Sequence, residues 1–191
     1  MKYPRLPVIL FGVFCLTVPS ANAEVVDPSP TGFTVKLHYS IQAPAGEVYR
    51  TMVRNIGDWW SSSHTYSGDS HNLVLEDNAR GCFCETLPNQ GSVRHMEVVL
   101  AMPGKLLRMT GGLGPLQEFA TGMLTITLTP SKDTPAGNTE LQVAYPVSSF
   151  QSKEMEKWGP LVEEVLNEQF ARLKTFAEKG GHGVKEVGET K

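Results

Sequence analysis

One long amphipathic helix that follows a series of short strands is the feature that most limits the fold of this chain. The helix is predicted over about 158–178, where apolar residues recur every three or four positions. These residues are Val162, Leu166, Phe170, Leu173 and Ala177. Between residues 73 and 147, apolar positions alternate with polar ones in about six segments, which is typical of an antiparallel meander. A meander with one apolar face has to be covered, and this helix is the long amphipathic element able to cover it.

An opening strand and a shorter helix precede the meander. Residues 33–41 alternate strictly between apolar and polar side chains, and Pro44 begins a helix that continues to Ile56. The order of strand, helix, meander and long helix predicts an α+β domain in which an antiparallel sheet wraps around the C-terminal helix. Such a sheet leaves space between itself and the helix, and that space is usually a pocket.

The N-terminal segment is typical of a secretory signal peptide. Lys2 and Arg5 precede the apolar run 6–18, and Ala21 and Ala23 supply the small residues of a cleavage site. The run is shorter than the roughly 20 apolar residues that a transmembrane helix needs. We therefore expect cleavage after Ala23 and a periplasmic or secreted protein without a stable membrane anchor. Retention of the segment as an anchor is the alternative.

The chain accordingly divides into a signal peptide (1–23), a Pro-containing linker (24–32), one domain (33–178) and a charged tail that we expect to be disordered (179–191). Loss of two basic residues with the signal leaves 15 basic and 20 acidic residues, a formal net charge of −5. This balance argues against nucleic acid or an anionic membrane as a partner, because both attract a basic surface. The sequence does not determine the oligomeric state.

Four segments carry a resemblance to a known superfamily. They are IQAPAGEVYRTMVRNIGDWW, GCFCETLPNQGSVRHMEV, PGKLLRM and WGPLVEEVLNEQFARLKTF. On these segments the chain, over about 33–178, resembles the START-like superfamily, also called SRPBCC, which includes polyketide cyclases, relatives of the birch-pollen allergen and lipid-transfer domains. The resemblance implies a helix-grip fold with a deep hydrophobic cavity between the sheet and the C-terminal helix. The ligand that it implies is a lipid, an isoprenoid, a polyketide or another apolar small molecule.

Two charged residues are predicted on the apolar face of the hairpin that turns at 88–91. The turn pairs Leu87 with Ser92, which sets Glu85 directly opposite Arg94. Buried charges are costly alone, and in a pair they can satisfy one another. We interpret Arg94 as an anchor for a carboxylate or hydroxyl of the ligand, oriented by Glu85. A cross-strand ion pair without a ligand role is the alternative.

The same alternation places Cys82, Cys84 and His95 together on the outer face, with Cys84 opposite His95. Thiolates and an imidazole can bind zinc or copper, but a Cys-x-Cys pair lacks the spacing of a zinc ribbon, so these residues are weak metal candidates. We predict two free thiols instead. Residues two apart on a strand have Cα atoms about 6.5 Å apart, which is at the limit of disulfide geometry.

Further ligand contacts are expected from the inner face and from two loops. Alternation predicts that the apolar residues of the inner face include Met96, Val98, Leu100, Met102, Met109 and Tyr145. The Gly-rich loop 111–118 is predicted to be a mobile flap whose Leu113 and Leu116 face the ligand. Trp59 and Trp60 are adjacent, so we expect one in the core and the other at the pocket entrance, unless both only fill the core.

The polar loop between the first helix and the meander contains His64, Asp69 and His71. Either histidine, with an aspartate nearby, has the chemistry of a general base or of a metal ligand. Loop histidines more often hydrogen-bond to the local backbone, and we prefer that interpretation.

These patterns favour an exported binding or carrier protein that encloses an apolar small molecule. No catalytic residue, resident metal or cofactor is predicted, because nucleophile-elbow, zinc-protease and phosphate-loop motifs are absent from the sequence. Glu85 is the one titratable group that alternation places on the cavity face, where a catalytic base would have to lie. The predicted pairing with Arg94 keeps Glu85 ionised and makes it a weak base. An enzyme of cyclase, dehydratase or hydrolase type that uses the same cavity is the alternative. A metal-binding outer face is the third hypothesis.

Overall fold

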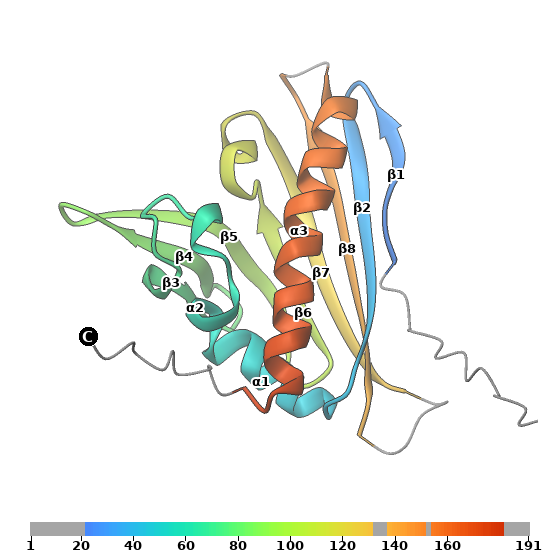
Figure 1. Cartoon of the computed structure of the whole chain (residues 1–191). Coiled ribbons are helices and arrows are strands. Elements are labelled where there is room, and N and C mark those ends of the chain that lie inside the picture. Colours follow the sequence, from blue (N-terminus) through green and yellow to red (C-terminus); the bar gives the residue numbers. More distant parts are fainter. Residues whose placement is uncertain (1–21, 132–136, 152–153, 182–191) are drawn as a thin grey trace, which may run out of the picture.

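An antiparallel sheet of eight strands and one long helix, α3, dominate the computed structural model, which describes residues 22–131, 137–151 and 154–181 (Figure 1). Across the sheet the strands follow the order β1-β2-β8-β7-β6-β5-β4-β3, and neighbouring strands are antiparallel. The strands are β1 (Asn22–Ser29), β2 (Gly32–Ile41), β3 (Leu73–Leu75), β4 (Cys82–Leu87), β5 (Gly91–Met102), β6 (Leu106–Gly111), β7 (Ala120–Pro130) and β8 (Thr139–Ser149). The helices are α1 (Ala45–Arg54), α2 (Ile56–Trp59) and α3 (Met155–Glu178), with short 3-10 turns η1 (Ser62–His64), η2 (Ser70–Asn72) and η3 (Gly114–Glu118).

The helix α3 runs along one face of the sheet, and the hairpin of β4 and β5 extends away from it (Figure 1). Its predicted stripe packs against the sheet, and four of its members are buried: Leu166, Phe170, Leu173 and Ala177. At Gly159 the helix comes so close to β1 that a Cβ there would lie 2.9 Å from Val25 Cγ1. The α+β class and the helix-grip arrangement, with the sheet wrapped around the C-terminal helix, are therefore confirmed.

Strand β2 has the alternating burial that the sequence predicts for residues 33–41. Its apolar residues Phe33, Val35, Leu37, Tyr39 and Ile41 are all buried, whereas the residues between them are half-buried or exposed. The ladder to β8 is unbroken from the pair Gly32–Ser148 to the pair Ile41–Thr139. This regular pairing forms the rigid part of the sheet beneath α3.

The expected linker at 24–32 is instead largely part of the sheet, and that prediction was wrong. Residues Asn22–Ser29 form β1, which pairs with β2 and includes the pair Val25–Val35. The prolines suggested a linker, but an edge strand tolerates proline where its ladder of hydrogen bonds is interrupted. The ladder between β1 and β2 is interrupted in this way between Val26 and Ser29. The expected signal peptide, up to residue 21, and the tail from 182 lie outside the described residues.

Two bulges in β5 change which side chains face the helix. In the hairpin Leu87 pairs with Gly91 rather than Ser92, so Cys84 pairs with Arg94. The next pair is Phe83 with Met96, which leaves His95 as an extra residue between the pairs. An extra residue reverses the alternation of a strand from that point onward.

The second bulge lies between Val98 and Leu100, where Val99 is the extra residue. Met96 and Val98 are buried, as predicted. Beyond the second bulge Leu100 and Met102 are 37% and 46% exposed, so their predicted inward orientation was wrong. Among the residues that the structure describes, no helix is both long enough and apolar enough to cross a membrane.

Candidate functional site

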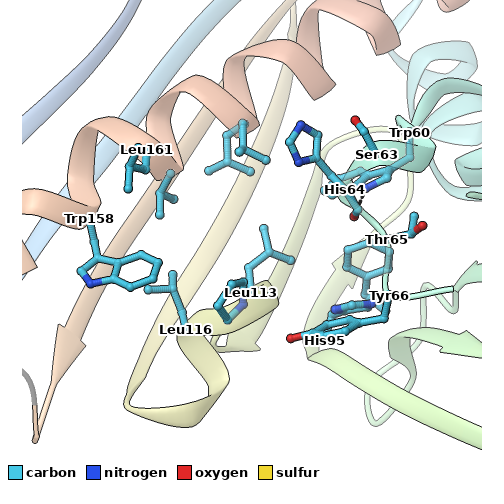
Figure 2. A pocket seen from close by; sticks show the side chains of 16 residues that line it. Trp60, Ser63, His64, Thr65, Tyr66, His95, Leu113, Leu116, Trp158 and Leu161 are labelled. Carbon is cyan, nitrogen blue, oxygen red and sulfur yellow. Dashed lines mark hydrogen bonds between the residues drawn. The ribbon is translucent and has the colours of Figure 1, made fainter. Parts of the chain in front are cut away.

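A cavity of about 360 Å³ lies between α3, the loop 61–69 and the turn η3 (Figure 2). Its lining is mainly apolar and comprises Trp60, Ser63, His64, Thr65, Tyr66, Phe83, His95, Leu113, Gly114, Pro115, Leu116, Trp158, Leu161, Val162, Val165 and Leu166. The volume falls in the range of sites for small molecules and cofactors. The predicted space between sheet and helix therefore exists, at the end of the sheet where the β4–β5 hairpin diverges.

One wall of the cavity comes from α3, whose contributing residues recur at helical spacing and so share a face. At the rim Leu161 is 56% exposed, and the Trp158 ring packs on Phe119 with centroids 5.1 Å apart. The sequence analysis identified Val162 and Leu166 on the helix stripe but did not assign Trp158, Leu161 or Val165 to a ligand site. These three residues can be assigned to the cavity wall only when the position of η3 is known.

A second wall comes from η3 and the residue that precedes it, since Leu116 and Leu113 both line the cavity. The hydroxyl of Tyr145 accepts a hydrogen bond from Leu113 N at 3.0 Å and donates to Gly111 O at 3.1 Å. Burial raises the pKa of Tyr145 to about 12, so this hydroxyl stays protonated and able to donate. Tyr145 therefore holds the loop in place and does not itself line the cavity.

Both adjacent tryptophans are buried, and one of them, Trp60, also lines the cavity. Trp60 lines the cavity, and its indole N–H donates to His64 O at 3.0 Å. Trp59 is buried in the core, where its N–H donates to Met52 O at 3.0 Å and its ring packs on Phe170. The inner-face residues Met96, Val98 and Met109 are also buried core and do not line the cavity.

Glu85 and His95 form a buried pair at the wall, in which His95 lines the cavity and Glu85 does not. Nε2 of His95 lies 3.0 Å from Oε2 of Glu85, and the side chains are 6% and 0% exposed. The same carboxylate accepts hydrogen bonds from the backbone N–H groups of Tyr66 and Ser67. Glu85 therefore joins β4, β5 and the loop 61–69 at one point.

Burial by itself raises the pKa of Glu85, but hydrogen bonds from Ser67, Tyr66 and His95 outweigh that effect and hold the pKa below its usual value. The carboxylate is thus ionised at neutral pH and accepts the N–H of His95 Nε2. In the neutral tautomer that carries its proton on Nε2, the lone pair lies on Nδ1. Nδ1 is buried and has no hydrogen-bond partner among the described residues.

The aromatic surroundings of His95 come from both strand and loop. The Tyr66 ring stacks on the imidazole with centroids 5.8 Å apart, and Phe83 lies 5.0 Å away at a tilt. Figure 2 shows Tyr66, His95 and Trp60 on one side of the cavity and Trp158 and Leu116 on the other. Alternation had assigned His95 to the outer face, so the sequence analysis missed it as a member of the inner wall.

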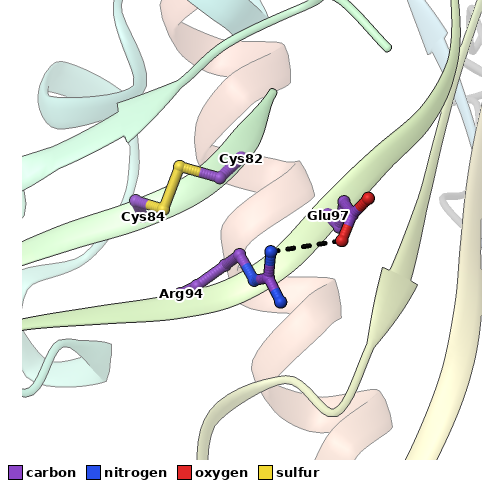
Figure 3. Close-up of a disulfide and its surroundings, with 4 residues drawn as sticks. All are labelled: Cys82, Cys84, Arg94 and Glu97. Carbon is purple, nitrogen blue, oxygen red and sulfur yellow. Dashed lines mark ion pairs between the residues drawn. A yellow bond between two sulfur atoms is a disulfide. The ribbon is translucent and has the colours of Figure 1, made fainter. Parts of the chain in front are cut away.

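Arg94, the predicted ligand anchor, lies on the opposite face of the sheet. Its guanidinium is 3.1 Å from Glu97, and the Arg94 side chain is 62% exposed. In Figure 3 α3 lies behind the strands, and Arg94 and Glu97 project on the side away from it. The prediction of an inward Glu85–Arg94 pair was wrong because the turn register differs by one residue and His95 forms the bulge.

The two cysteines are joined in a disulfide on this outer face, so the prediction of free thiols was wrong (Figure 3). The Cα atoms of Cys82 and Cys84 are 5.4 Å apart, closer than the 6.5 Å expected for a regular strand, because β4 departs from regular pairing at Phe83. With both sulfurs bonded and His95 on the other face, the outer metal site does not form. Within the described part of the chain, no cluster of three or more His, Cys, Asp or Glu side chains is arranged to hold a metal.

The loop histidines bind carboxylates rather than the backbone oxygens that we preferred. Nε2 of His64 is 2.9 Å from Glu168 on α3, and Nδ1 of His71 is 3.0 Å from Asp69. His64 lines the cavity, whereas His71 does not. No local pattern could have predicted the contact of His64 with Glu168, since the two residues are 104 positions apart.

Comparison with known proteins identifies the fold and nothing more specific. No family model matches the sequence, and no curated protein matches it. A solved structure from Mesorhizobium loti is similar, with a TM-score of 0.54, 20% identity and coverage of 76% of this chain and 97% of that one. A protein from Rhodobacter sphaeroides gives a TM-score of 0.55 at 16% identity, with coverage of 81% and 97%. A conserved protein of unknown function from Enterococcus faecalis gives 0.54 at 14% identity, with coverage of 88% and 82%. These likenesses show a shared sheet-and-helix fold.

Proposed function

We propose that this protein binds an apolar small molecule in the cavity beneath α3 and acts as an exported binding or carrier protein. The observation that supports this most directly is the cavity of about 360 Å³ with its leucine, valine and aromatic walls. Its lining has few polar side chains, and most of those already have a protein partner. A ligand that is mainly hydrocarbon, such as a lipid, isoprenoid or polyketide, suits such walls.

Membership of the SRPBCC superfamily is part of the same proposal. The helix-grip arrangement and the position of the cavity between sheet and C-terminal helix agree with the resemblance drawn from the sequence. Fold alone does not fix a function, so the proposal depends on the cavity walls rather than on the superfamily.

Export to the periplasm or outside the cell is supported by two independent features. The N-terminal segment has the pattern of a cleaved signal peptide. The disulfide between Cys82 and Cys84 is of a kind that persists in oxidising compartments. Intact-mass measurement of the protein recovered from the native host should give the mass of a chain that begins at Glu24. A mass that includes the first 23 residues would contradict the proposed export.

Ligand binding is tested with the mature protein and a panel of fatty acids, isoprenoid quinones, sterols and aromatic polyketides. A ligand at a hundred times its dissociation constant adds about 2.7 kcal/mol to the free energy of unfolding, which a thermal-shift assay detects. Mass spectrometry of small molecules that co-purify with the native protein provides an unbiased second search. If no compound in either search raises the melting temperature, the proposed function is wrong.

A matched pair of variants locates the binding site. Val162→Phe fills part of the cavity from α3, so we expect it to abolish the thermal shift caused by the ligand. Val74→Phe makes the same change on β3, where the side chain is 49% exposed and outside the cavity lining, and should leave the shift unaltered. Equal effects of the two variants would place binding elsewhere on the protein.

An enzyme acting in the same cavity is the second candidate, because two histidines of the wall are each hydrogen-bonded to a glutamate. These pairs are His95 with Glu85 and His64 with Glu168. A histidine oriented by a carboxylate is a common general acid or base. Among the described hydrogen bonds, none joins either imidazole to a hydroxyl or thiol nucleophile, so acid–base chemistry on the ligand fits better than hydrolysis through a covalent intermediate. Incubation of the bound compound with excess protein, followed by mass spectrometry of the products, distinguishes turnover from binding.

A further inference from the structure

One polar atom in the cavity wall lacks a partner, and it belongs to His95. In the described part of the chain, three buried side-chain polar atoms make no hydrogen bond: Tyr49 Oη, Gln169 Nε2 and His95 Nδ1. Of the residues that carry these atoms, His95 is the one that lines the cavity. A buried acceptor without a partner destabilises the protein, and a ligand that donates a hydrogen bond to it offsets that cost.

The chemistry of Nδ1 follows from the other side of the ring. The ionised Glu85 accepts a hydrogen bond from the N–H at Nε2, and the tautomer with its proton on Nε2 carries its lone pair on Nδ1. The carboxylate of Glu85 is held by the backbone N–H groups of Tyr66 and Ser67. Its contact with Nε2 of His95 favours the tautomer that carries the proton on Nε2 over the one that carries it on Nδ1. In this tautomer Nδ1 is a hydrogen-bond acceptor without a donor.

Three other polar side chains of the lining already have a hydrogen-bond partner. Ser63 Oγ bonds with Ser61 Oγ, Thr65 Oγ1 donates to Ser62 O, and His64 bonds with Glu168. The rings that pack on His95 are those of Tyr66 and Phe83, and Phe83 is in T-shaped contact with Trp60. An aromatic ligand ring suits these neighbours.

The charge of Glu85 restricts the ligand further. A ligand carboxylate beside His95 would bring a second negative charge close to Glu85 in an apolar wall, which is unfavourable. Arg94 cannot offset that charge, because it lies on the other face of the sheet and pairs with Glu97. A neutral hydroxyl donor carries no such penalty.

From these contacts, and building on the proposed ligand binding, we propose that the polar end of the ligand is a neutral phenol or enol hydroxyl that donates a hydrogen bond to Nδ1 of His95. Glu85 is the positioning residue, since it fixes the tautomer that leaves Nδ1 free to accept. The site then prefers aromatic hydroxyl compounds over their ethers and over carboxylates of the same skeleton. An arginine anchor would have the opposite preference, because a guanidinium favours carboxylates over neutral hydroxyls.

The test uses three matched probes that share one ring system: 2-naphthol, 2-methoxynaphthalene and 2-naphthoate. Dissociation constants for the mature protein are measured by calorimetry or by ligand fluorescence at pH 7, where naphthol is neutral and naphthoate is ionised. We expect 2-naphthol to bind about tenfold more tightly than 2-methoxynaphthalene, the effect of one buried hydrogen bond. We expect 2-naphthoate to bind more weakly than both.

Two variants assign the preference to His95. His95→Phe removes the acceptor and should bring the naphthol and ether affinities to within a factor of about two, since the hydrogen bond is lost while the ring volume is kept. His38→Phe is the matched control, because His38 also pairs with a glutamate, Glu140 at 2.9 Å, but on an exposed face outside the cavity lining. If His95→Phe fails to fold, the ¹⁵N chemical shift of His95 Nδ1 in the wild-type protein still reports whether 2-naphthol donates to it.

The outcomes separate this inference from the proposed function. Equal binding of naphthol and its ether, tighter binding of naphthoate, or an Nδ1 shift unmoved by naphthol overturns the role of His95 and leaves apolar binding intact. Failure of all three probes to bind overturns the role of His95, whereas the proposed function is judged by the lipid and polyketide panel. Selective binding of naphthol that His95→Phe abolishes and His38→Phe preserves supports both.

Discussion

The carboxylate of Glu85 lies 3.0 Å from the imidazole of His95, and the same carboxylate holds the backbone of the cavity loop at Tyr66 and Ser67. One buried charge thus connects two strands of the sheet with the loop that forms a wall of the ligand site. Removal of that charge should therefore affect both the stability of the fold and the shape of the cavity.

Glu85→Gln tests this connection. The amide has one acceptor oxygen where three donors converge, and its NH₂ group opposes at least one N–H. We expect the free energy of unfolding at pH 7 to fall by about 1–3 kcal/mol, measured by urea titration. Glu97→Gln is the control, because its pair with Arg94 is exposed and should contribute at most about 1 kcal/mol. Similar losses in the two variants would contradict a special role for Glu85.

The stability conferred by Glu85 should disappear in acid. Its pKa is lower in the folded protein than the ordinary value of 4.5. A carboxyl with a depressed folded pKa contributes stability that is present above its unfolded pKa and is lost as the pH falls through the folded value. The difference in urea midpoint between wild type and Glu85→Gln should therefore be constant from pH 6 to 7 and shrink below about pH 4.5. A difference that grows as the pH falls would contradict the assignment.

Arg94→Met should leave ligand binding unchanged. The guanidinium lies outside the cavity and most of it is exposed, so its loss removes only a solvent-screened contact with Glu97. We expect a change of about 0.5 kcal/mol or less in unfolding free energy, and the same dissociation constant for 2-methoxynaphthalene as in wild type. A weakened affinity with unaltered stability would restore Arg94 as a ligand contact.

The mature protein should contain no titratable thiol before reduction. Cys82 and Cys84 are joined to each other, and Cys15 lies in the segment whose cleavage we propose. Titration with a thiol reagent in denaturant should find none in the oxidised protein and both cysteines after treatment with a dithiol. Two thiols in the unreduced protein, with correct controls for handling, would show that the bond does not form in solution.

The layout of this fold was predictable because it depends on long, regular patterns. The strict alternation of β2 and the stripe of α3 each repeat over several residues, so a single irregular position does not obscure them. The α+β class, the wrapped sheet and the presence of a cavity follow from those two patterns. Leu113 and Leu116 lie in the Gly-rich loop between predicted strands and line the cavity, and their contact with a ligand stays a prediction.

The polar centre of the site could not be predicted because it depends on one extra residue. The sequence around His95, VRHME, contains no glycine or proline to mark a bulge, so alternation assigned His95 and Arg94 to the wrong faces. A bulge can change the orientation of single side chains, so the assignments of His95 and Arg94 failed together, whereas Met96 is buried as predicted. The disulfide was missed for a related reason, since its Cα separation departs from that of a regular strand.

The pairing of β1 with β2 sets an order of events for a chain that is processed after Ala23. Ala23 pairs with Leu37 and Glu24 pairs with Lys36, so the bond to be cut lies inside the sheet once its edge has closed. A peptidase needs that backbone free of its neighbour strand. Processing therefore has to precede closure of this edge, and a precursor that folded early would conceal its own cleavage site. For the export that we propose, the edge of the sheet therefore has to stay open until the chain has been cut.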